Sequence, residues 1–235
     1  MCNLYHLSPP NDLQTHFRAR VRSGAVWPVG VVGPFGVGGF VRPGADGLEA
    51  VVGQWGMVPP GSAARRPAAR TILTNNARAE GLAERPTYRG AWQRGQRCLI
   101  PASWFQEPNW ETGRNHWWQL RRADGAPWAL AGIWADWTDP ASGEVLPTYS
   151  MITTCCDGHP LLGRLHKPDP KLPADAQDKR ATVQIEPAHW HDWLHGDEAT
   201  ARALIAPAPA EVFDRSVTQP VDRLLAGAAS QGSLI

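Results

Sequence analysis

Cys2 directly follows the initiator methionine, so its chemistry depends on whether that methionine is removed. Removal would leave Cys2 as an N-terminal cysteine with an α-amine and a thiol on adjacent carbons. The reference pKa values of these groups are about 7.7–8.0 and about 8.5, so both are partly deprotonated at neutral pH. The amine can condense with an aldehyde to an imine, and the thiolate can then close onto the same carbon as a thiazolidine. The alternative is a cysteine that packs as a small apolar side chain.

Three polar residues supply the other groups that an aldehyde condensation needs. The reaction requires a proton acceptor, a hydrogen-bonding group that orients the aldehyde, and an acid that protonates the departing oxygen. Glu107, Asn76 and His166 are of these types. Glu107 ends an apolar run, where an unpaired carboxylate would be unfavourable without a role or a partner. Asn76 and Arg78 share one side of an extended segment, so one could contact the reacting centre while the other binds phosphate.

Arginine supplies most of the positive charge of the chain, whose formal net charge is only +1. So small a net charge produces no global field that recruits nucleic acid, and such a partner must bind to a local patch. Arginine makes planar, bidentate contacts with phosphate. The candidate patch consists of Arg65, Arg66, Arg70 and Arg78. The alternative is that these arginines reflect codon composition.

The 12 tryptophans suggest base stacking, because an aromatic face stabilises an unstacked base by about 1–3 kcal/mol. We nevertheless expect most of them in the core. Trp104 adjoins the strand of Glu107 and is the candidate for a DNA contact. Trp117 and Trp118 are adjacent in a predicted strand, so one of them must face outward or toward a ligand.

No metal and no cofactor are predicted. His191 and His195 are one helical turn apart, a spacing that occurs in zinc sites, but a solvated helix face explains it equally well. Cys155 and Cys156 are expected to point to opposite sides of a strand. Because neither belongs to a CxxC pair, packing in the interior is favoured for both.

The composition favours one soluble domain. At 235 residues the chain is long enough for one substantial core, and no change of composition indicates a second domain. No apolar stretch approaches the roughly 18 residues that span a bilayer, and the start of the chain lacks the regions of a signal peptide. The four cysteines are irregularly spaced, which fits a reducing compartment better than a disulfide framework. We therefore expect a cytoplasmic protein without a membrane partner.

The elements that must position these side chains are mostly strands. Between residues 26 and 47 the density of Gly and Pro favours short strands and turns over helix. Longer strands are predicted at Leu48–Val58, Arg97–Phe105, His116–Arg121, Trp128–Trp137, Thr148–Thr154 and Ala181–Ile185.

A few helices are expected beside these strands. The spacing of Leu13 and Phe17 predicts a helix that follows two prolines and ends near Arg20. Pro187 predicts the start of a pair of short packing helices that runs through Leu204.

Five short motifs occur in a characteristic order: MCNLY at the start, WGMVP (Trp55 to Pro59), NAR-E (Asn76 to Glu80), RCLIPA----E (Arg97 to Glu107), and ITT (Ile152 to Thr154) followed by His166. With these motifs the chain resembles, from Met1 to about Ile205, the SOS response-associated peptidase (SRAP) domain family, whose members crosslink to abasic sites in single-stranded DNA. The resemblance implies a single α+β domain, mostly antiparallel β and barrel-like, with a few flanking helices. The domain is expected to span residues 1–224, and residues 225–235 are expected to form a disordered tail.

The resemblance also implies roles for the candidate residues. An autopeptidase activity removes the methionine, Cys2 forms a thiazolidine with the ring-opened deoxyribose aldehyde, and Asn76 holds the reacting end. Glu107 supports methionine removal or proton transfer, and His166 acts as an acid or base in ring opening and in reversal of the link. Arg78 holds a DNA phosphate. The expected protein is a nucleoid-associated monomer with crosslinking and lyase-like activity, and its partner is single-stranded DNA that contains abasic sites.

The chain departs from the family pattern at three places. Members commonly have an aromatic residue after the glutamate and an Asp-Gly before the preceding aromatic, whereas Pro108 and Ser103-Trp104 stand here, which changes the surface expected to stack with bases. Many members begin Met-Cys-Gly-Arg, whereas Asn3 and Leu4 stand here, so an arginine that contacts DNA is missing. After His166 the familiar Asp-Arg-Met-Pro is replaced by KPDPKLPADAQDKRA, with Arg180 as the possible counterpart of the arginine. His159, seven residues upstream, is the alternative catalytic histidine.

Two other classes of protein fit parts of the sequence. A glutamine amidotransferase of the N-terminal nucleophile type also exposes a cysteine after losing its methionine, but motifs for glutamine binding are not found. A non-catalytic single-stranded DNA-binding module could use the region from Arg65 to Arg78, but it leaves Cys2 unexplained. An abasic-site crosslinking protein is therefore the function that the sequence favours.

Overall fold

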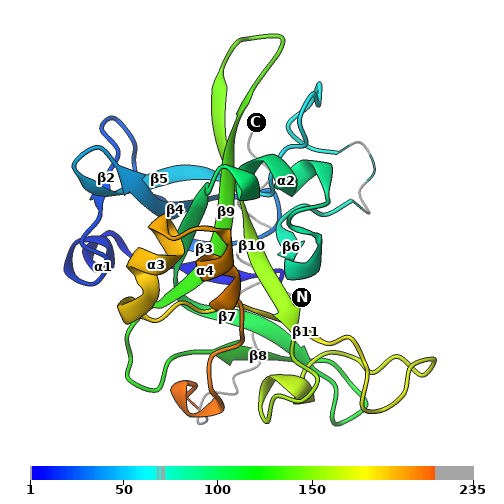
Figure 1. Ribbon diagram of the computed structural model, residues 1–235. Helices are drawn as coiled ribbons and strands as arrows, with labels where there is room; N and C mark the ends of the chain where they lie inside the picture. The colour runs from blue at the N-terminus through cyan, green and yellow to red at the C-terminus, as the bar shows by residue number, and fades with distance from the viewer. Residues whose placement is uncertain (1, 68, 70–71, 215–235) are drawn as a thin grey trace.

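The computed structural model describes residues 2–67, 69 and 72–214. Within these ranges five strands close into a barrel in the order β10–β5–β4–β7–β9, because β9 pairs with both β7 and β10 (Figure 1). The barrel consists of β4 (Val37–Gly44), β5 (Gly47–Trp55), β7 (Arg97–Asn109), β9 (Trp128–Thr138) and β10 (Val145–Cys155). Its neighbouring strands are antiparallel except for β5 and β10. The predicted α+β fold, mostly antiparallel and barrel-like, is confirmed.

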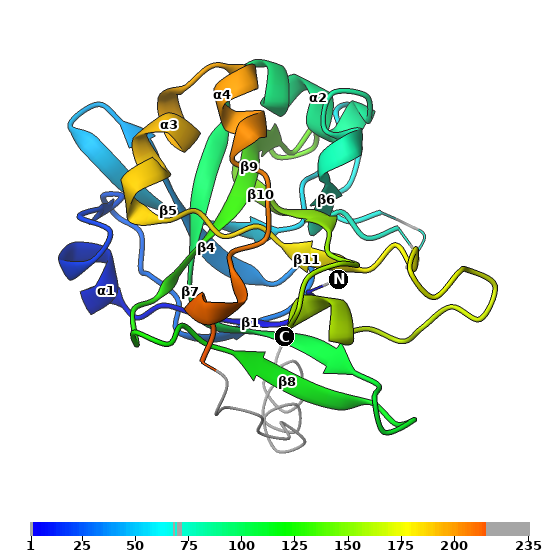
Figure 2. The same ribbon diagram turned by 60° about the horizontal axis from the view of Figure 1, so that its bottom comes forward.

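Shorter strands extend the barrel at its edges. They are β1 (Tyr5–Leu7), β2 (Arg20–Val21), β3 (Gly30–Val32), β6 (Asn76–Arg78), β8 (His116–Leu120) and β11 (Arg180–Thr182). β1 lies between β7 and β3, and β8 pairs with the end of β7, as Figure 2 shows. β6 and β11 both pair with β10. Two segments about 100 residues apart in the chain are thereby brought to the same end of β10.

The longest strand, β7, is buried along most of its length, which explains its nearly continuous apolar sequence RCLIPASWF. It has neighbours on both edges, so its side chains face other strands and helices and not solvent. The hairpin between β4 and β5 turns tightly at Gly47, whose φ of 110 is accessible to glycine and strained for other residues. Six of the 12 tryptophans are buried, so the core holds half of them.

The first helix, α1 (Pro10–Thr15), ends earlier than the predicted Arg20. Arg18 has a φ of 51, a left-handed conformation that does not continue an α-helix. The main-chain N–H of Ala19 then donates to the Leu13 carbonyl at 2.8 Å. The turn directs Phe17 into the core, where it is 1% exposed, so the predicted apolar face exists but its last residue lies beyond the helix.

The other helices pack against the barrel. α3 (Trp190–His195) and α4 (Glu198–Ala203) are the predicted helical pair, preceded by the 3-10 turn Pro187–His189, and they lie together on one side in Figure 1. α2 (Pro86–Gln93) was not predicted, although Tyr88, Ala91 and Trp92 supply a buried face at helical spacing. Further 3-10 turns lie at Ala79–Gly81, Leu162–Arg164 and Ala210–Val212.

Several predicted boundaries shift by a few residues. The strand predicted at Leu48–Val58 ends at Trp55, because Gly56 turns with a φ of 145. The strand predicted at Ala181–Ile185 is shorter. β10 ends at Cys155, and only Cys156 is buried, so the predicted interior packing was wrong for Cys155, which is exposed. No helix in the described part is long and apolar enough to cross a membrane. The predicted tail at 225–235 lies outside the described residues.

Candidate active site

The pairing of β1 with β7 brings the start of the chain alongside Glu107. The Gln106 main-chain N–H donates to the Leu4 carbonyl oxygen at 3.0 Å, so the residues before β1 continue along the strand that contains Glu107. Cys2 is completely buried, at 0% exposure, and its Sγ donates to the Leu4 carbonyl at 3.3 Å. β7 therefore fixes the main chain that follows Cys2.

Two asparagines at the start of β6 hold the main chain of Cys2. The Asn76 Nδ2 donates to the Cys2 carbonyl oxygen at 2.6 Å. The Asn75 Nδ2 lies 3.5 Å from the same oxygen and 3.5 Å from Asn3 Oδ1. Asn76 was predicted, but the fully buried Asn75 was missed. Its signal was available, because an amide next to Asn76 just before a strand must find partners if it is buried.

The side chains of Glu107 and His166 contact each other in the candidate site. His166 Nε2 is 3.3 Å from Glu107 Oε2 and 2.6 Å from the Arg180 carbonyl oxygen. Because a carbonyl only accepts, the hydrogen of the neutral imidazole lies on Nε2. The His166 main-chain N–H donates to the Pro108 carbonyl at 2.6 Å, which ties the histidine loop to the end of β7. His166 has a φ of 66, a strained conformation that these contacts maintain.

Burial dominates the protonation of all three titratable groups. It raises the pKa of Glu107 to about 7 and lowers the pKa of His166 to about 4. The pKa of the Cys2 thiol is raised well above its ordinary value, first by burial and then by the nearby Glu107 carboxylate. In this buried state the Cys2 thiol is held in its protonated form. The expectation of partial deprotonation concerns Cys2 after loss of Met1 and stays a prediction. The sulfur needs a base, and Glu107 is a buried group that changes protonation near neutrality.

His159, the alternative histidine, is occupied by the main chain around it. Its Nδ1 accepts from the Leu161 and Leu162 main-chain N–H groups at 3.2 and 2.9 Å. Its Nε2 lies 2.9 Å from the Ala208 carbonyl oxygen. Both ring nitrogens thus stabilise a turn, whereas His166 contacts Glu107.

Of the predicted phosphate-binding arginines, Arg78 lies nearest in the fold to the candidate site, two residues after Asn76 on β6. Its guanidinium is about half exposed and pairs with Asp178 at 3.2 Å. Arg66 instead donates to the Phe35 carbonyl at 3.1 Å, and its guanidinium lies over the Phe35 ring at 6.0 Å from the centroid. Arg70 lies outside the described residues. The Arg65 carbonyl accepts from Gln54 Nε2 at 2.9 Å, so Arg65, Arg66 and Arg78 contact different partners.

Trp104 is placed differently from the prediction. It is only 4% exposed, and its ring packs against His6 with centroids 5.4 Å apart. In this conformation its face is covered, so it offers no surface for a base. The partly exposed Trp110 and Trp118 are nearer to the histidine loop, because the Lys167 Nζ lies 5.0 Å from the Trp110 ring centroid and the Arg164 guanidinium lies 5.3 Å from that of Trp118.

The two histidines of α3 that have the spacing of zinc ligands lie next to each other. The rings of His191 and His195 have centroids 5.0 Å apart. Across the described ranges, no group of three or more His, Cys, Asp or Glu side chains could hold a metal ion.

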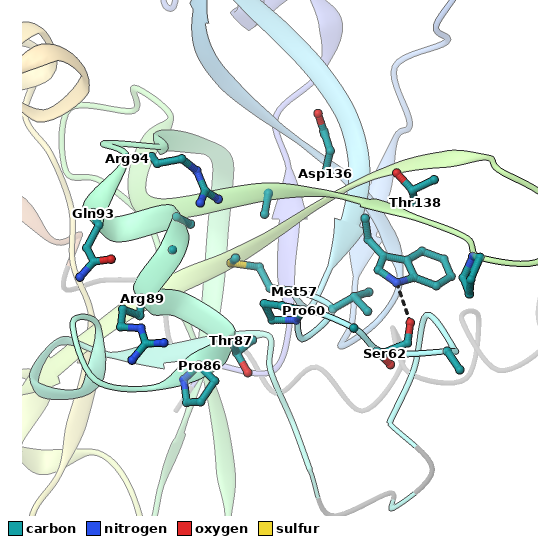
Figure 3. A pocket seen from close by; sticks show the side chains of 18 residues that line it. Met57, Pro60, Ser62, Pro86, Thr87, Arg89, Gln93, Arg94, Asp136 and Thr138 are labelled. Atoms are coloured by element: carbon teal, nitrogen blue, oxygen red, sulfur yellow. Dashed lines mark hydrogen bonds between the residues drawn. The ribbon is translucent and has the colours of Figure 1, made fainter.

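A separate cleft of about 760 Å³ lies between residues 57–63, α2 and the end of β9 (Figure 3). Arg89, on α2, and Arg94, the residue after α2, line the cleft. Two other lining residues contact each other, because the Trp137 Nε1 donates to the Ser62 carbonyl at 3.0 Å. None of Cys2, Asn76, Glu107 or His166 lines this cleft, so it is distinct from the candidate active site.

The sequence matches one family over most of its length. The family described as SOS response associated peptidase (SRAP) matches residues 1–224. Among curated relatives, the abasic site processing protein HMCES of Gallus gallus is 26% identical over 203 residues, which cover 75% of this chain and 57% of that protein. The abasic site processing protein YoqW of Bacillus subtilis is 29% identical over 141 residues, which cover 57% of this chain and 58% of the relative. The chain thus spans little more than half the length of these curated relatives.

Solved structures share the fold. A protein from Bordetella bronchiseptica is 32% identical and superimposes with a TM-score of 0.78, covering 91% of this chain and 97% of that chain. A protein from Bacteroides thetaiotaomicron, at 21% identity and a TM-score of 0.70, covers 91% of this chain and 90% of its own, and supports the fold alone.

Proposed function

The chain belongs to the SOS response associated peptidase family, and from this premise we propose that it processes abasic sites in single-stranded DNA by forming a thiazolidine crosslink through Cys2 after Met1 is removed. The observation that most directly supports this proposal is that polar side chains from separate strands meet at Cys2. Asn76 binds its carbonyl oxygen at 2.6 Å, and the Glu107 carboxylate, which lies 3.3 Å from His166, is close enough to raise the pKa of the thiol. The names of the relatives, which are abasic site processing proteins, support the choice of lesion.

Removal of Met1 is assigned to Glu107. In the proposed step the carboxylate accepts a proton from the water that attacks the Met1 carbonyl carbon. The resulting acid donates that proton to the departing amine of Cys2. A pKa of about 7 suits both halves of this cycle at neutral pH. Asn76 keeps the Cys2 main chain in place while the bond to Met1 breaks.

Crosslinking then uses both nucleophiles of Cys2. The amine adds to the aldehyde carbon of the ring-opened sugar, and loss of one water gives the imine. The sulfur adds to the same carbon, and the thiol proton passes through Glu107 to the imine nitrogen, so the net loss is one water. Because Cys2 is 0% exposed, the proposal requires the site to open before the sugar reaches the sulfur. A lyase-like reaction would start from the imine, by loss of a proton at C2′ and departure of the 3′ phosphate.

His166 is proposed as the acid or base that moves the proton at the sugar oxygen. Its lowered pKa keeps it neutral at pH 7, with an N–H directed at Glu107 Oε2 and the Arg180 carbonyl. As a neutral imidazole whose hydrogen lies on Nε2, His166 can take the proton of the C1′ hydroxyl at Nδ1 and give a proton to the ring oxygen as the C1′–O4′ bond breaks, and the reverse transfers close the ring. Arg78 is proposed to hold a phosphate of the same strand.

A non-catalytic single-stranded DNA-binding module is the second candidate, and the complete burial of Cys2 is the observation that favours it. In that case Cys2 is a packing residue and Asn76 is a structural partner of its carbonyl. Phosphate binding at Arg78 would be common to both candidates.

Intact mass spectrometry separates the two. We expect the purified chain to lack Met1 and to gain the mass of an abasic single-stranded oligonucleotide, less one water, in a product that survives a denaturing gel. An oligonucleotide with a tetrahydrofuran analogue, which has no aldehyde, is the matched control and should give no product. A chain that retains Met1 and binds both oligonucleotides equally, without covalent product, would establish the binding module.

A further inference from the structure

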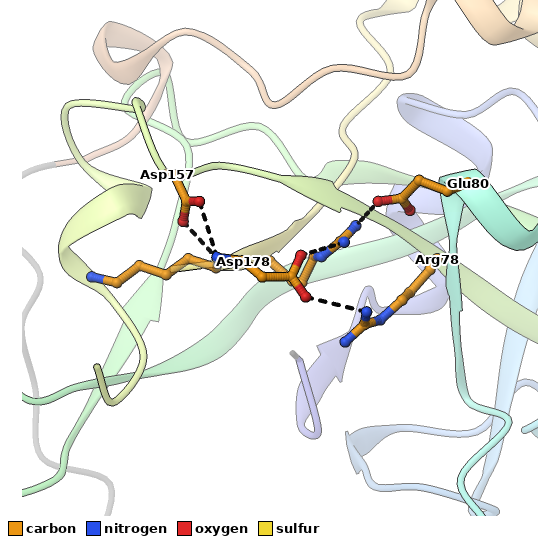
Figure 4. A network of polar contacts seen from close by, with 6 residues as sticks. Arg78, Glu80, Asp157 and Asp178 are labelled. Atoms are coloured by element: carbon orange, nitrogen blue, oxygen red, sulfur yellow. Dashed lines mark hydrogen bonds and ion pairs between the residues drawn. The ribbon is translucent and has the colours of Figure 1, made fainter. Parts of the chain in front are cut away.

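One carboxylate lies between the two arginines at the edge of the candidate site. Asp178 Oδ2 pairs with Arg78 Nη1 at 3.2 Å, and Asp178 Oδ1 pairs with Arg180 Nη2 (Figure 4). Arg180 also pairs with Glu80. Each carboxylate oxygen of Asp178 thus pairs with one guanidinium. Two arginines bind the oxygens of a phosphate in the same way.

The main chain of Asp178 is fixed in this position. The Asp157 carboxylate accepts from the Asp178 N–H at 3.0 Å and from the Lys179 N–H at 2.8 Å. Asp178 has a φ of 52, so the loop turns sharply at this residue. The carboxylate is therefore presented to Arg78 by an anchored loop. This loop is the KPDPKLPADAQDKRA segment in which the chain departs from the family pattern.

The bridged arginines are directly connected to the candidate site. Arg78 follows Asn76 by two residues on β6, and Asn76 binds the Cys2 carbonyl. The Arg180 carbonyl accepts from His166 Nε2 at 2.6 Å. A phosphate next to the reacting sugar would thus meet the Asp178 carboxylate at Arg78.

We propose that Asp178 is a specificity-determining residue that occupies the phosphate position on Arg78 and weakens the binding of intact single strands. This inference rests on the proposed function. A phosphate contact is the same on damaged and undamaged DNA, so a free Arg78 would hold both. With Asp178 in competition, an intact strand is released quickly, whereas an abasic strand is retained by its covalent bond.

The competition is of moderate strength. The side chains of Arg78 and Asp178 are 51% and 44% exposed, and ion pairs this exposed exchange readily with other ions. A phosphate can therefore displace the carboxylate, and the carboxylate acts as a graded competitor.

The test compares Asp178→Asn with Asp175→Asn in the full-length chain, with fluorescence anisotropy of an intact single-stranded oligonucleotide. Asparagine keeps the size of the side chain and tolerates the positive φ. Asp175 lies on the same loop and is exposed, so its replacement removes an equal charge. We expect Asp178→Asn to tighten binding about three- to fivefold and to steepen the salt dependence, and Asp175→Asn to change it less than about twofold.

Two further variants keep the test decisive. Addition of Arg78→Ala to Asp178→Asn should remove the gain. Asp157→Asn, which loosens the Asp178 main chain without altering Arg78, should give a smaller gain even if Asp178→Asn melts at a lower temperature. In a competition assay, excess intact strand should slow the crosslinking of an abasic strand more for Asp178→Asn than for the unaltered chain.

Equal gains from Asp178→Asn and Asp175→Asn, or a gain that survives Arg78→Ala, would overturn the inference in favour of a general charge effect. Failure of the proposed function gives a different result. In that case the unaltered chain forms no denaturant-stable product with abasic DNA, whatever the aspartate variants do to the binding of intact strands.

Discussion

At the scale of single residues, the reactivity of Cys2 depends on its buried surroundings as well as on its position after the initiator methionine. Burial and Glu107 hold the thiol protonated, so the sulfur reacts only when a base takes its proton. Glu107 is suited to that role by its raised pKa and its contact with His166. We therefore propose that the three side chains act as one proton-transfer unit, in which the loss of any member affects the other two.

Replacement of Cys2 tests the nucleophile. Cys2→Ala should abolish the denaturant-stable crosslink, because it removes the sulfur that closes the thiazolidine. Cys2→Ser keeps the amine and should give at most a reversible imine, which borohydride reduction would trap. Because Cys2 is fully buried, Cys2→Ala should also lower the free energy of unfolding by about 1 kcal/mol. A gel-stable product from folded Cys2→Ala would disprove the mechanism.

Glu107→Gln tests the base. The amide keeps the shape of the side chain but cannot accept the proton, so we expect retained Met1 and crosslinking slowed at least tenfold. In the unaltered chain the crosslinking rate should rise with pH through about 7, as Glu107 loses its proton, and this rise should be absent in Glu107→Gln. N-terminal mass and crosslinking rate, measured on the same samples, provide the comparison.

The same variant separates a catalytic from a structural glutamate. The folded chain binds the Glu107 proton more tightly than the unfolded chain does, so the free energy of unfolding falls as pH rises from about 4.5 to about 7. This displacement of the pKa corresponds to a free energy on the order of 3 kcal/mol. Glu107→Gln removes the dependence and should melt no lower than the unaltered chain at about pH 8. Lower stability with a normal rate in the folded fraction would instead indicate a structural role.

His166→Ala should affect the reaction rate, whereas His159→Ala should affect stability. His166→Ala should slow crosslink formation and exchange onto a competing abasic strand, with near-normal affinity for intact single-stranded DNA. His159→Ala should lower the melting temperature, because three main-chain contacts of a turn are lost, while the folded fraction reacts at a normal rate. A slow reaction of His159→Ala with a normal His166→Ala would reverse the assignment.

At the scale of elements, two strand pairings build the site. The antiparallel pairing of β1 with β7 places the residues before Tyr5 beside Glu107. The parallel pairing of β6 with β10 aligns Asn76 with Met151 and Arg78 with Thr153. Alternation along β6 buries Ala77 between them, so one short strand supplies both the Cys2 contact and the exposed guanidinium.

The exposed end of β6 should govern affinity without sequence preference. Arg78→Ala should weaken the binding of intact single strands several-fold and reduce the salt slope by about 1, equally for all sequences. Arg66→Ala is the control, because its guanidinium is held against Phe35 and should contribute less. Unchanged affinity and salt slope in Arg78→Ala would place the phosphate groove elsewhere.

At the scale of the whole molecule, every residue of the candidate site lies between Cys2 and His166, on the barrel strand β7, on the edge strand β6 and in the segments beside them. The predicted tail should therefore be dispensable. Deletion of residues 225–235, a stretch with little apolar surface to bury, should leave the melting temperature and the crosslinking rate unchanged, and both lengths should elute as monomers in size-exclusion chromatography with light scattering. A lower melting temperature of the shortened chain would show that these residues pack on the domain.

The sequence by itself determined the elements and the chemical identity of the site. Strand periodicity located the barrel strands β5, β7, β9 and β10, and the spacing within NAR-E placed Asn76 and Arg78 on one strand. These features depend on neighbours in the chain, so local patterns report them. The end of the first helix was less accessible, because main-chain contacts such as that of Ala19 with Leu13 decide it.

Tertiary structure alone decided which histidine meets Glu107, which groups are protonated, and what pairs with Arg78. His159 and His166 have the same intrinsic chemistry, and only the contact of the histidine loop with β7 distinguishes them. The shifted pKa values arise from burial, which is produced by strands far apart in the sequence. Asp178 reaches Arg78 across 100 residues of chain. Each of these properties depends on distances between segments that the fold brings together, and no local pattern encodes them.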